Sequence, residues 1–260
     1  MKENLYVSKA GDIAEMVINR PRKKNSITDA MWGRLPELVA AVDADPEVKV
    51  LVIRGSTSDA FSAGADLNEY RAQVGDPEWS RESRHQVTEA LVALREMAKP
   101  SISAIRGACF GGGVAIALAS DFRLADTTSY FSVSPSRMGM VYLFPATVEL
   151  VRTVGTSAAK RLLYTGEVFD AQEADRIGLL DRLAPPEGLD EEVDDLCRKL
   201  SAVSQFSVRA TKRIVHLIED GLTEENEETT RLAIDALAGE DHLEGVAAFL
   251  EKRPARFRFR

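Results

Sequence analysis

Apolar residues in the first half of the chain form two kinds of pattern, short continuous runs and helically spaced stripes. The runs 13–19 and 48–55 are rich in β-branched residues, and the second is apolar enough for a strand buried on both faces. Residues 26–45 and 80–98 place apolar side chains at helical spacing. Because strands separated by helices pair in parallel, the pattern predicts an α/β layered fold.

The predicted helix over 26–45 has a start signal and an interruption. Ser26 or Thr28 can cap it, because a hydroxyl oxygen there accepts a hydrogen bond from a free backbone N–H. Pro36 lies inside the stretch and predicts a kink or a later start. A further strand is expected to end at Gly107, and residues 121–133 predict two more short strands.

The pattern changes after about residue 155, where almost every segment has helical spacing. The breaks between these segments fall at Gly166, Pro185–Pro186 and Gly221. We therefore divide the chain into an α/β core over residues 1–195 and a helical C-terminal region over residues 196–260.

Composition narrows the possible partners. The 260 residues are 45% apolar and carry a formal net charge of -8, which argues against nucleic acid because phosphate binding needs a basic face. Cys109 and Cys197 form no cluster with metal-ligand spacing, so we expect neither a disulfide framework nor a metal site. No apolar stretch suits a signal peptide or a membrane span. We expect a cytoplasmic protein without a membrane partner.

Two segments of small residues each follow a predicted strand, FSAGADL over 61–67 and GGGVAI over 111–116. Three consecutive glycines are costly in ordered chain, which indicates that another group comes very close to the backbone. A junction between strand and helix also exposes free N–H groups, where the helix dipole favours negative charge. Two such junctions facing each other have the composition of an oxyanion hole. Tight turns or close helix packing would use the same residues.

These segments resemble the enoyl-CoA hydratase/isomerase superfamily, the crotonases. The similarity rests on FSAGADLNEY and ISAIRGACFGGGVAIALASDFRLA, and it continues in NRPRKKNSIT, LLYTGEVFDAQEADRIGLLDRL and EGVAAFLEKRPARF. It covers nearly the whole chain in the expected order. The resemblance implies a core of repeated ββα units and a helical C-terminal oligomerisation region, with a homotrimer or a dimer of trimers. It also implies an acyl-CoA thioester as ligand, with coenzyme A as part of the substrate and no other cofactor.

The resemblance assigns roles to particular residues. The backbone N–H groups of Ala65 and Gly112 would hold the thioester oxygen as it becomes an enolate, and a side chain at Gly112 would block it. Asp66 would support the loop of the first donor. The remaining residues expected to contact the substrate are Ala63, Leu67, Gly111 and Pro135. Lys23 and Lys24 would bind the phosphates of coenzyme A, and plain solvated charge is the alternative for both.

The family resemblance also shows what is missing. Family members that hydrate a double bond use two glutamates, one two residues beyond the last glycine of the triplet and one four residues before the glycine of the next loop. Here these positions hold Ala115 and Pro135, the latter before Gly139. Neither residue can move a proton. The sequence therefore predicts a site that holds an oxyanion without hydrating.

The segment FSVSPSRMGMVYL resembles the corresponding loop of the methylmalonyl-CoA decarboxylases, with Pro135 and Tyr142 at matching positions. Decarboxylation suits a site without glutamates, because loss of CO₂ generates the enolate directly. Tyr142 would donate a hydrogen bond that turns the carboxylate out of the thioester plane, or would line the acyl tunnel. The chain departs from that subgroup at Ala65 and Ala115, where the decarboxylases have a histidine and an acid.

Two other functions stay open. One is an enoyl-CoA hydratase or isomerase that uses a carboxylate from elsewhere, with Glu149 as the first candidate. The other is a catalytically silent protein that binds acyl-CoA.

Overall fold

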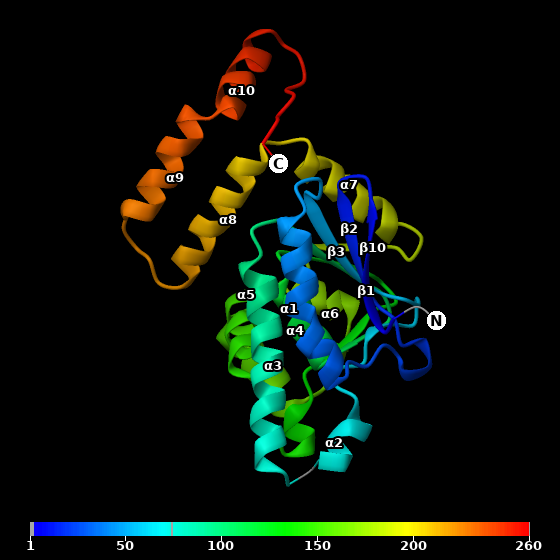
Figure 1. The fold of residues 1–260 in the computed structure, drawn as a ribbon. Helices are drawn as coiled ribbons and strands as arrows, with labels where there is room; N and C mark the ends of the chain where they lie inside the picture. Colours follow the sequence, from blue (N-terminus) through cyan, green and yellow to red (C-terminus); the bar gives the residue numbers. More distant parts are fainter. Residues whose placement is uncertain (1–2, 74, 260) are drawn as a thin grey trace.

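The chain builds two sheets side by side, and the computed structural model describes residues 3–73 and 75–259 (Figure 1). The larger sheet has the strand order β1-β2-β3-β5-β7-β10. Its strands are β1 (Leu5–Ala10), β2 (Ile13–Ile18), β3 (Val50–Gly55), β5 (Ser101–Ile105), β7 (Phe122–Asp126) and β10 (Arg182–Ala184). β1 and β2 form an antiparallel hairpin, and from β2 onward every neighbouring pair is parallel.

The smaller sheet has the order β4-β6-β8-β9. Its strands are β4 (Ala60–Ser62), β6 (Ala108–Phe110), β8 (Tyr130–Ser132) and β9 (Val168–Asp170). Along the chain each larger-sheet strand from β3 to β7 is followed by a smaller-sheet strand and then by helix. This order confirms the repeated ββα core that the resemblance implies.

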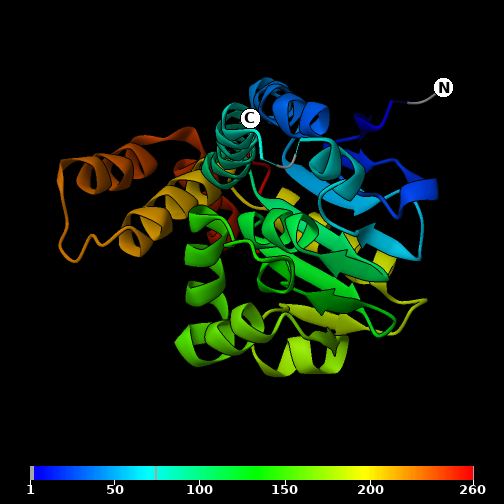
Figure 2. The same ribbon diagram turned by 90° about the horizontal axis from the view of Figure 1, so that it is seen from below.

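The helices of the core cover both faces of the larger sheet. They are α1 (Asp29–Ala44), α2 (Leu67–Gln73), α3 (Pro77–Glu96), α4 (Gly112–Ala119), α5 (Phe144–Thr165), α6 (Ala171–Arg176) and α7 (Leu189–Ser201). The main apolar core lies among α1, α3, α4 and α5, and α1 and α3 lie side by side in both views (Figures 1 and 2). A second apolar cluster joins α7 to the opposite face of the sheet.

The predicted elements can be compared with these bounds. The run 48–55 becomes β3, whose first four residues are buried. Thr28 is the N-cap of α1, because its side chain accepts a hydrogen bond from the N–H of Met31. Pro36 lies inside α1, and the helix continues through it to Ala44. The helix expected over 80–98 is α3, which begins three residues earlier because Asp76 caps it.

The C-terminal helices α8 (Gln205–Glu219), α9 (Glu227–Ala238) and α10 (Glu240–Leu250) extend away from the sheets (Figure 1). The helical C-terminal region is therefore confirmed. The division at 195/196 falls inside α7 and stays a prediction. None of the helices among the described residues is long and apolar enough to cross a membrane.

Candidate active site

The two glycine-containing junctions lie next to each other in the fold. β4 and β6 are parallel neighbours, so the chain leaves both strands at the same edge of the smaller sheet. The segments that follow them, 63–67 and 110–112, line one cavity of about 660 Å³. The structure thus brings Ala63, Ala65, Asp66, Leu67, Gly111 and Gly112 together, as the sequence predicts.

Ala65 forms an isolated parallel β-bridge with Ile27 that leaves its own N–H unused. The N–H of Ile27 donates to the carbonyl of Gly64 at 2.8 Å, and the N–H of Asp66 donates to the carbonyl of Ile27 at 3.0 Å. In a parallel bridge of this kind Ile27 bonds to the two neighbours of Ala65, so Ala65 uses neither its own N–H nor its own C=O in the bridge. Within residues 3–73 and 75–259, no group accepts a hydrogen bond from the Ala65 N–H.

Gly112 supplies the second free donor, because it is the first residue of α4 and the first N–H groups of a helix have no internal partner. A Cβ atom built on Gly112 would lie 3.7 Å from the Ala65 nitrogen. The two N–H groups therefore border one small space. The use of this pair of donors as an oxyanion hole stays a prediction.

Each position of the glycine triplet requires glycine for a different physical reason. Gly111 has φ 44° and ψ -104°, a backbone conformation that residues with a Cβ rarely adopt. At Gly112 a Cβ would lie 2.9 Å from a ring carbon of Trp32. At Gly113 it would lie 2.7 Å from the carbonyl oxygen of Ser62. Close packing therefore explains the glycines at 112 and 113, and the role of Gly112 as an oxyanion donor stays a prediction.

Asp66 holds the first donor loop to the chain segment before α1. Its carboxylate accepts from the Arg20 guanidinium at 2.8 Å, and Arg20 also donates to the carbonyl of Ser26 at 2.8 Å. The hydrogen bond from Arg20, together with one from the N–H of Asn68, lowers the pKa of Asp66. Asp66 is only 7% exposed, so this pair fixes the loop that carries Ala65.

Lys23 and Lys24 lie beside the donor loop but outside the lining of the cavity. The carbonyl of Lys24 accepts a hydrogen bond from the N–H of Ala63 at 2.9 Å. Both side chains are exposed. Their role in binding phosphate stays a prediction.

The two positions where hydratases have glutamates also line the cavity, and here they are Ala115 and Pro135. Tyr142 lines it as well, and its hydroxyl donates to the carbonyl of Gly111 at 2.9 Å. Burial raises the pKa of this phenol. The hydroxyl proton is therefore engaged by the backbone next to the second donor.

The opposite wall contains polar residues that the sequence analysis did not identify. The N-terminus of α1 together with α2 and α3 contributes Asp29, Glu69, Tyr70, Trp79, Ser83 and Arg84 to the lining. Asp29 follows a helix cap, a place where an acid is common for reasons of helix stability alone. Its spacing of three from Trp32 puts both side chains on one helix face, which is the signal that could have found it.

The expectation that Glu149 reaches the acyl site is wrong. Glu149 lines a different cavity, of about 750 Å³, between the core and α8. Its carboxylate pairs with Arg152 at 2.9 Å and Arg95 at 3.2 Å. Burial raises the pKa of Glu149, and these two arginines oppose that rise. Glu149 thus lines the cavity beside α8 and not the one that contains the two donors.

Glu149→Gln is expected to leave kcat and KM for any acyl-CoA substrate unchanged, because the side chain lies outside the cavity that contains the two donors. Steady-state kinetics beside a thermal-unfolding curve check this. A loss of about a hundredfold in kcat at unchanged stability, as expected for a lost general acid or base, would contradict it.

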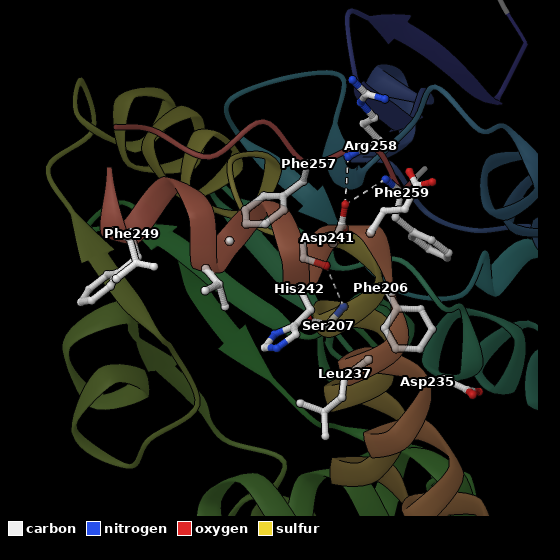
Figure 3. Close-up of a pocket in the computed structure, with 17 residues that line it drawn as sticks. Phe206, Ser207, Asp235, Leu237, Asp241, His242, Phe249, Phe257, Arg258 and Phe259 are labelled. Atoms are coloured by element: carbon white, nitrogen blue, oxygen red, sulfur yellow. Dashed lines mark hydrogen bonds between the residues drawn. The ribbon is translucent and has the colours of Figure 1, made fainter. Parts of the chain in front are cut away.

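A third cavity, of about 620 Å³, lies among α8, α9, α10 and the C-terminal tail (Figure 3). Its lining is mainly apolar and includes Phe206, Leu237, Phe249 and Phe257. Asp241 accepts hydrogen bonds from the N–H groups of Arg258 and Phe259 and so fastens the tail to α10. None of the predicted site residues lines this cavity.

Comparison with known proteins agrees with this geometry. Residues 8–260 match the family model for enoyl-CoA hydratase/isomerase. The chain is 34% identical to the crotonyl-CoA hydratase of Syntrophomonas wolfei, over 98% of each chain. A crystal structure of an enoyl-CoA hydratase/isomerase family protein from Hyphomonas neptunium superposes with a TM-score of 0.96 at 39% identity, covering 99% of this chain and 98% of that one. Pseudomonas aeruginosa DspI gives 0.93 at 31% identity, covering 99% and 97%. The chain therefore belongs to the enoyl-CoA hydratase/isomerase family.

Proposed function

We propose that the protein binds an acyl-CoA thioester in the 660 Å³ cavity and decarboxylates a malonyl-type acyl group through an enolate. One observation carries the choice of reaction. The cavity presents Ala115 and Pro135 at the two positions where related hydratases are expected to have their acids. Although the relatives compared above include a crotonyl-CoA hydratase, neither residue here can deliver or remove a proton.

In this reaction the bond between Cα and the carboxylate carbon breaks, and its electron pair moves toward the thioester carbonyl. CO₂ leaves, and the carbonyl oxygen carries the negative charge of the enolate. The N–H groups of Ala65 and Gly112 stabilise that oxygen, each by about 3 kcal/mol in the transition state. A proton from solvent then binds Cα and gives the shortened acyl-CoA. The negative charge develops on an oxygen that the two donors stabilise. Because CO₂ rather than a proton leaves Cα, the reaction needs no general base.

The surroundings of the donors suit the loss of a carboxylate. Ala115, Met138 and Leu143 line the cavity and offer the leaving group no hydrogen bond. An apolar wall destabilises a carboxylate more than it destabilises neutral CO₂. Rotation of the Tyr142 hydroxyl away from the Gly111 carbonyl would turn its proton toward the substrate, in the role expected from the sequence.

Mass spectrometry of purified protein incubated separately with methylmalonyl-CoA and crotonyl-CoA tests the proposal. Loss of CO₂ from the first and no change in the second is the expected result. Addition of water to crotonyl-CoA would overturn it and indicate hydration, with Asp29 and Glu69 as the cavity carboxylates to examine. Tight binding of both without turnover would overturn it in favour of a silent acyl-CoA-binding protein.

We also propose that the C-terminal helices join copies of the chain into a trimer or a dimer of trimers. Large apolar side chains on α9 and α10 are open to solvent, among them Phe249 at 83% and Leu250 at 74% exposure. Contiguous apolar surface of this kind is typical of an interface. Sedimentation velocity should give a mass of three or six chains, and a monomer at micromolar concentration would contradict the assembly.

A further inference from the structure

The polar wall of the 660 Å³ cavity, made of Asp29, Glu69, Tyr70, Trp79 and Ser83, contrasts with the apolar side around Ala115. The reaction proposed above uses none of these polar groups. Ser83 is buried and the other four residues are partly buried. Hydrogen-bonding groups removed from water are costly to keep in a cavity that takes only hydrocarbon. The wall therefore calls for a ligand group that matches it.

Asp29 is held in one orientation from two directions. One carboxylate oxygen accepts from the indole N–H of Trp79 at 2.7 Å, and the other accepts from the hydroxyl of Ser83 at 3.0 Å. Trp79 and Ser83 are four residues apart, on one face of α3. The backbone N–H of Asp29 itself donates to the Glu69 carboxylate at 2.9 Å. The carboxylate is thus fixed where α1, α2 and α3 meet.

Asp29 has unused acceptor capacity toward the cavity. An ionised carboxylate offers about four lone-pair sites, and the two bonds from α3 occupy two of them. Asp29 lines the cavity, and among residues 3–73 and 75–259 its carboxylate accepts hydrogen bonds only from Trp79 and Ser83. Burial, together with the Asp29 charge, raises the pKa of Tyr70, so this neighbouring phenol is a hydrogen-bond donor at neutral pH.

The wall lies close to the reacting centre but not on it. Trp32 is one helical turn after Asp29, and its ring is the group that a Cβ on Gly112 would meet at 2.9 Å. Side chains three residues apart on a helix have Cβ atoms about 5–6 Å apart. A substrate whose carbonyl oxygen occupies the donor pair therefore reaches the wall with a later part of its acyl chain.

We propose that this wall selects an acyl group carrying a hydroxyl beyond the reacting carbons, and that the hydroxyl donates its hydrogen bond to Asp29. The inference rests on the proposed acyl-CoA site. A terminal carboxylate would be repelled by Asp29 and Glu69. An ammonium group would lose its hydration on entering the cavity, a cost that a neutral hydroxyl avoids. An acyl chain that ends in a methyl group would displace water from the Asp29 carboxylate without offering it a hydrogen bond. A neutral donor is the group that meets all three conditions.

Binding of saturated acyl-CoAs by isothermal titration calorimetry tests this without turnover. The probes are 4-hydroxybutyryl-CoA against butyryl-CoA and 6-hydroxyhexanoyl-CoA against hexanoyl-CoA. At one chain length or both, the hydroxylated thioester should bind about tenfold more tightly, the effect of one satisfied hydrogen bond to a charged group. Glutaryl-CoA, which ends in a carboxylate, should bind more weakly than either partner of the shorter pair.

Asp29→Asn should reduce the preference for the hydroxyl to less than about threefold, because the amide offers fewer and weaker acceptor sites. Glu82→Gln is the matched control, since it removes a carboxylate from the exposed face of α3 outside the cavity and should keep the preference. Ser83→Ala removes one of the two hydrogen bonds that orient Asp29 and should weaken the preference less than Asp29→Asn does. Loss of the preference in Ser83→Ala with its retention in Asp29→Asn would overturn the assignment to Asp29.

The outcomes separate this inference from the proposed function. If no acyl-CoA binds, the acyl-CoA site itself is wrong. If hydroxylated and plain thioesters bind equally to the unmodified protein at both lengths, the selection by the polar wall is wrong and the oxyanion site stands. The comparison of thioesters on the unmodified protein can refute the inference by itself. The test therefore still works if Asp29→Asn does not fold.

Discussion

Gly112→Ala is expected to lower kcat by about 10²- to 10³-fold, the loss typical of removing one oxyanion donor. The added methyl group would lie 3.7 Å from the Ala65 nitrogen, in the space where the thioester oxygen accepts its hydrogen bonds. It would also press on a ring carbon of Trp32 at 2.9 Å. The backbone at Gly112 does not have a positive φ, so alanine is compatible with the helix itself. Steady-state kinetics with a parallel measurement of acyl-CoA binding would show the effect.

Gly33→Ala provides the matched control for this substitution. Gly33 also lies in a helix without a positive φ, and a Cβ there meets only the Gln86 side chain at 3.8 Å, an ordinary contact. It should keep full activity and gain about 1 kcal/mol of stability from helix propensity. Turnover of Gly112→Ala within about threefold of the unmodified protein would refute the oxyanion assignment, because a lost donor costs far more.

Asp66→Asn is expected to lower the free energy of unfolding at pH 7 by about 2 kcal/mol, because it leaves the Arg20 guanidinium without its anionic partner in a half-buried place. The side chains of Arg20 and Asp66 are 16% and 8% exposed. Because Arg20 also holds Ser26, the substitution loosens two segments that border the donor loop. Turnover should fall together with stability. Urea unfolding followed by circular dichroism measures the first effect.

The pH dependence of this pair has a definite sign. The hydrogen bond from Arg20 lowers the pKa of Asp66 in the folded protein below its unfolded value of about 3.9. The contribution to stability is therefore complete above that unfolded pKa and is lost as the pH falls through the folded one. The stability difference between the native protein and Asp66→Asn should shrink below about pH 4. A difference that stays constant down to acid unfolding would contradict the ion pair as its source.

Asp45→Asn is the control for a surface pair. Asp45 bonds to Lys9 at 2.9 Å, but both side chains are about a third exposed or more, so solvent screens them. Its substitution should change stability much less than Asp66→Asn. An equal loss would show that burial is not what distinguishes the Arg20–Asp66 pair.

Much of the fold could be predicted because its signals are local. β3 is a continuous apolar run, and α1 begins after a hydroxyl cap at Thr28. Short strands such as β4, with three residues, are harder, because a run of that length has no measurable period. The interruption expected at Pro36 did not end α1, because packing on α3 and the sheet stabilises the helix through it.

The glycines of the candidate site could be predicted from local signals, and the positions of its carboxylates could not. Gly111 needs its glycine for a local backbone angle, and Gly112 starts a helix, so both leave a mark in the sequence itself. Glu149 and Asp29 are each an acid on a helix, and the spacing of Asp29 from Trp32 is only a weak local signal that distinguishes them. One lies in the α8 cavity with Arg95, and the other lies beside the two donors.

The sequence by itself therefore determined much of the order of strands and helices and a hydroxyl cap for α1, because hydrophobic period and helix ends act within a few residues. The two backbone donors were assigned through the family resemblance. Only the tertiary structure decided which side chains share the cavity. The approach of Trp32 to Gly112, the pairing of Arg20 with Asp66 and the meeting of Asp29 with Trp79 all join distant segments. Such contacts depend on how helices pack across the sheets, and that packing is a property of the whole core rather than of any one segment.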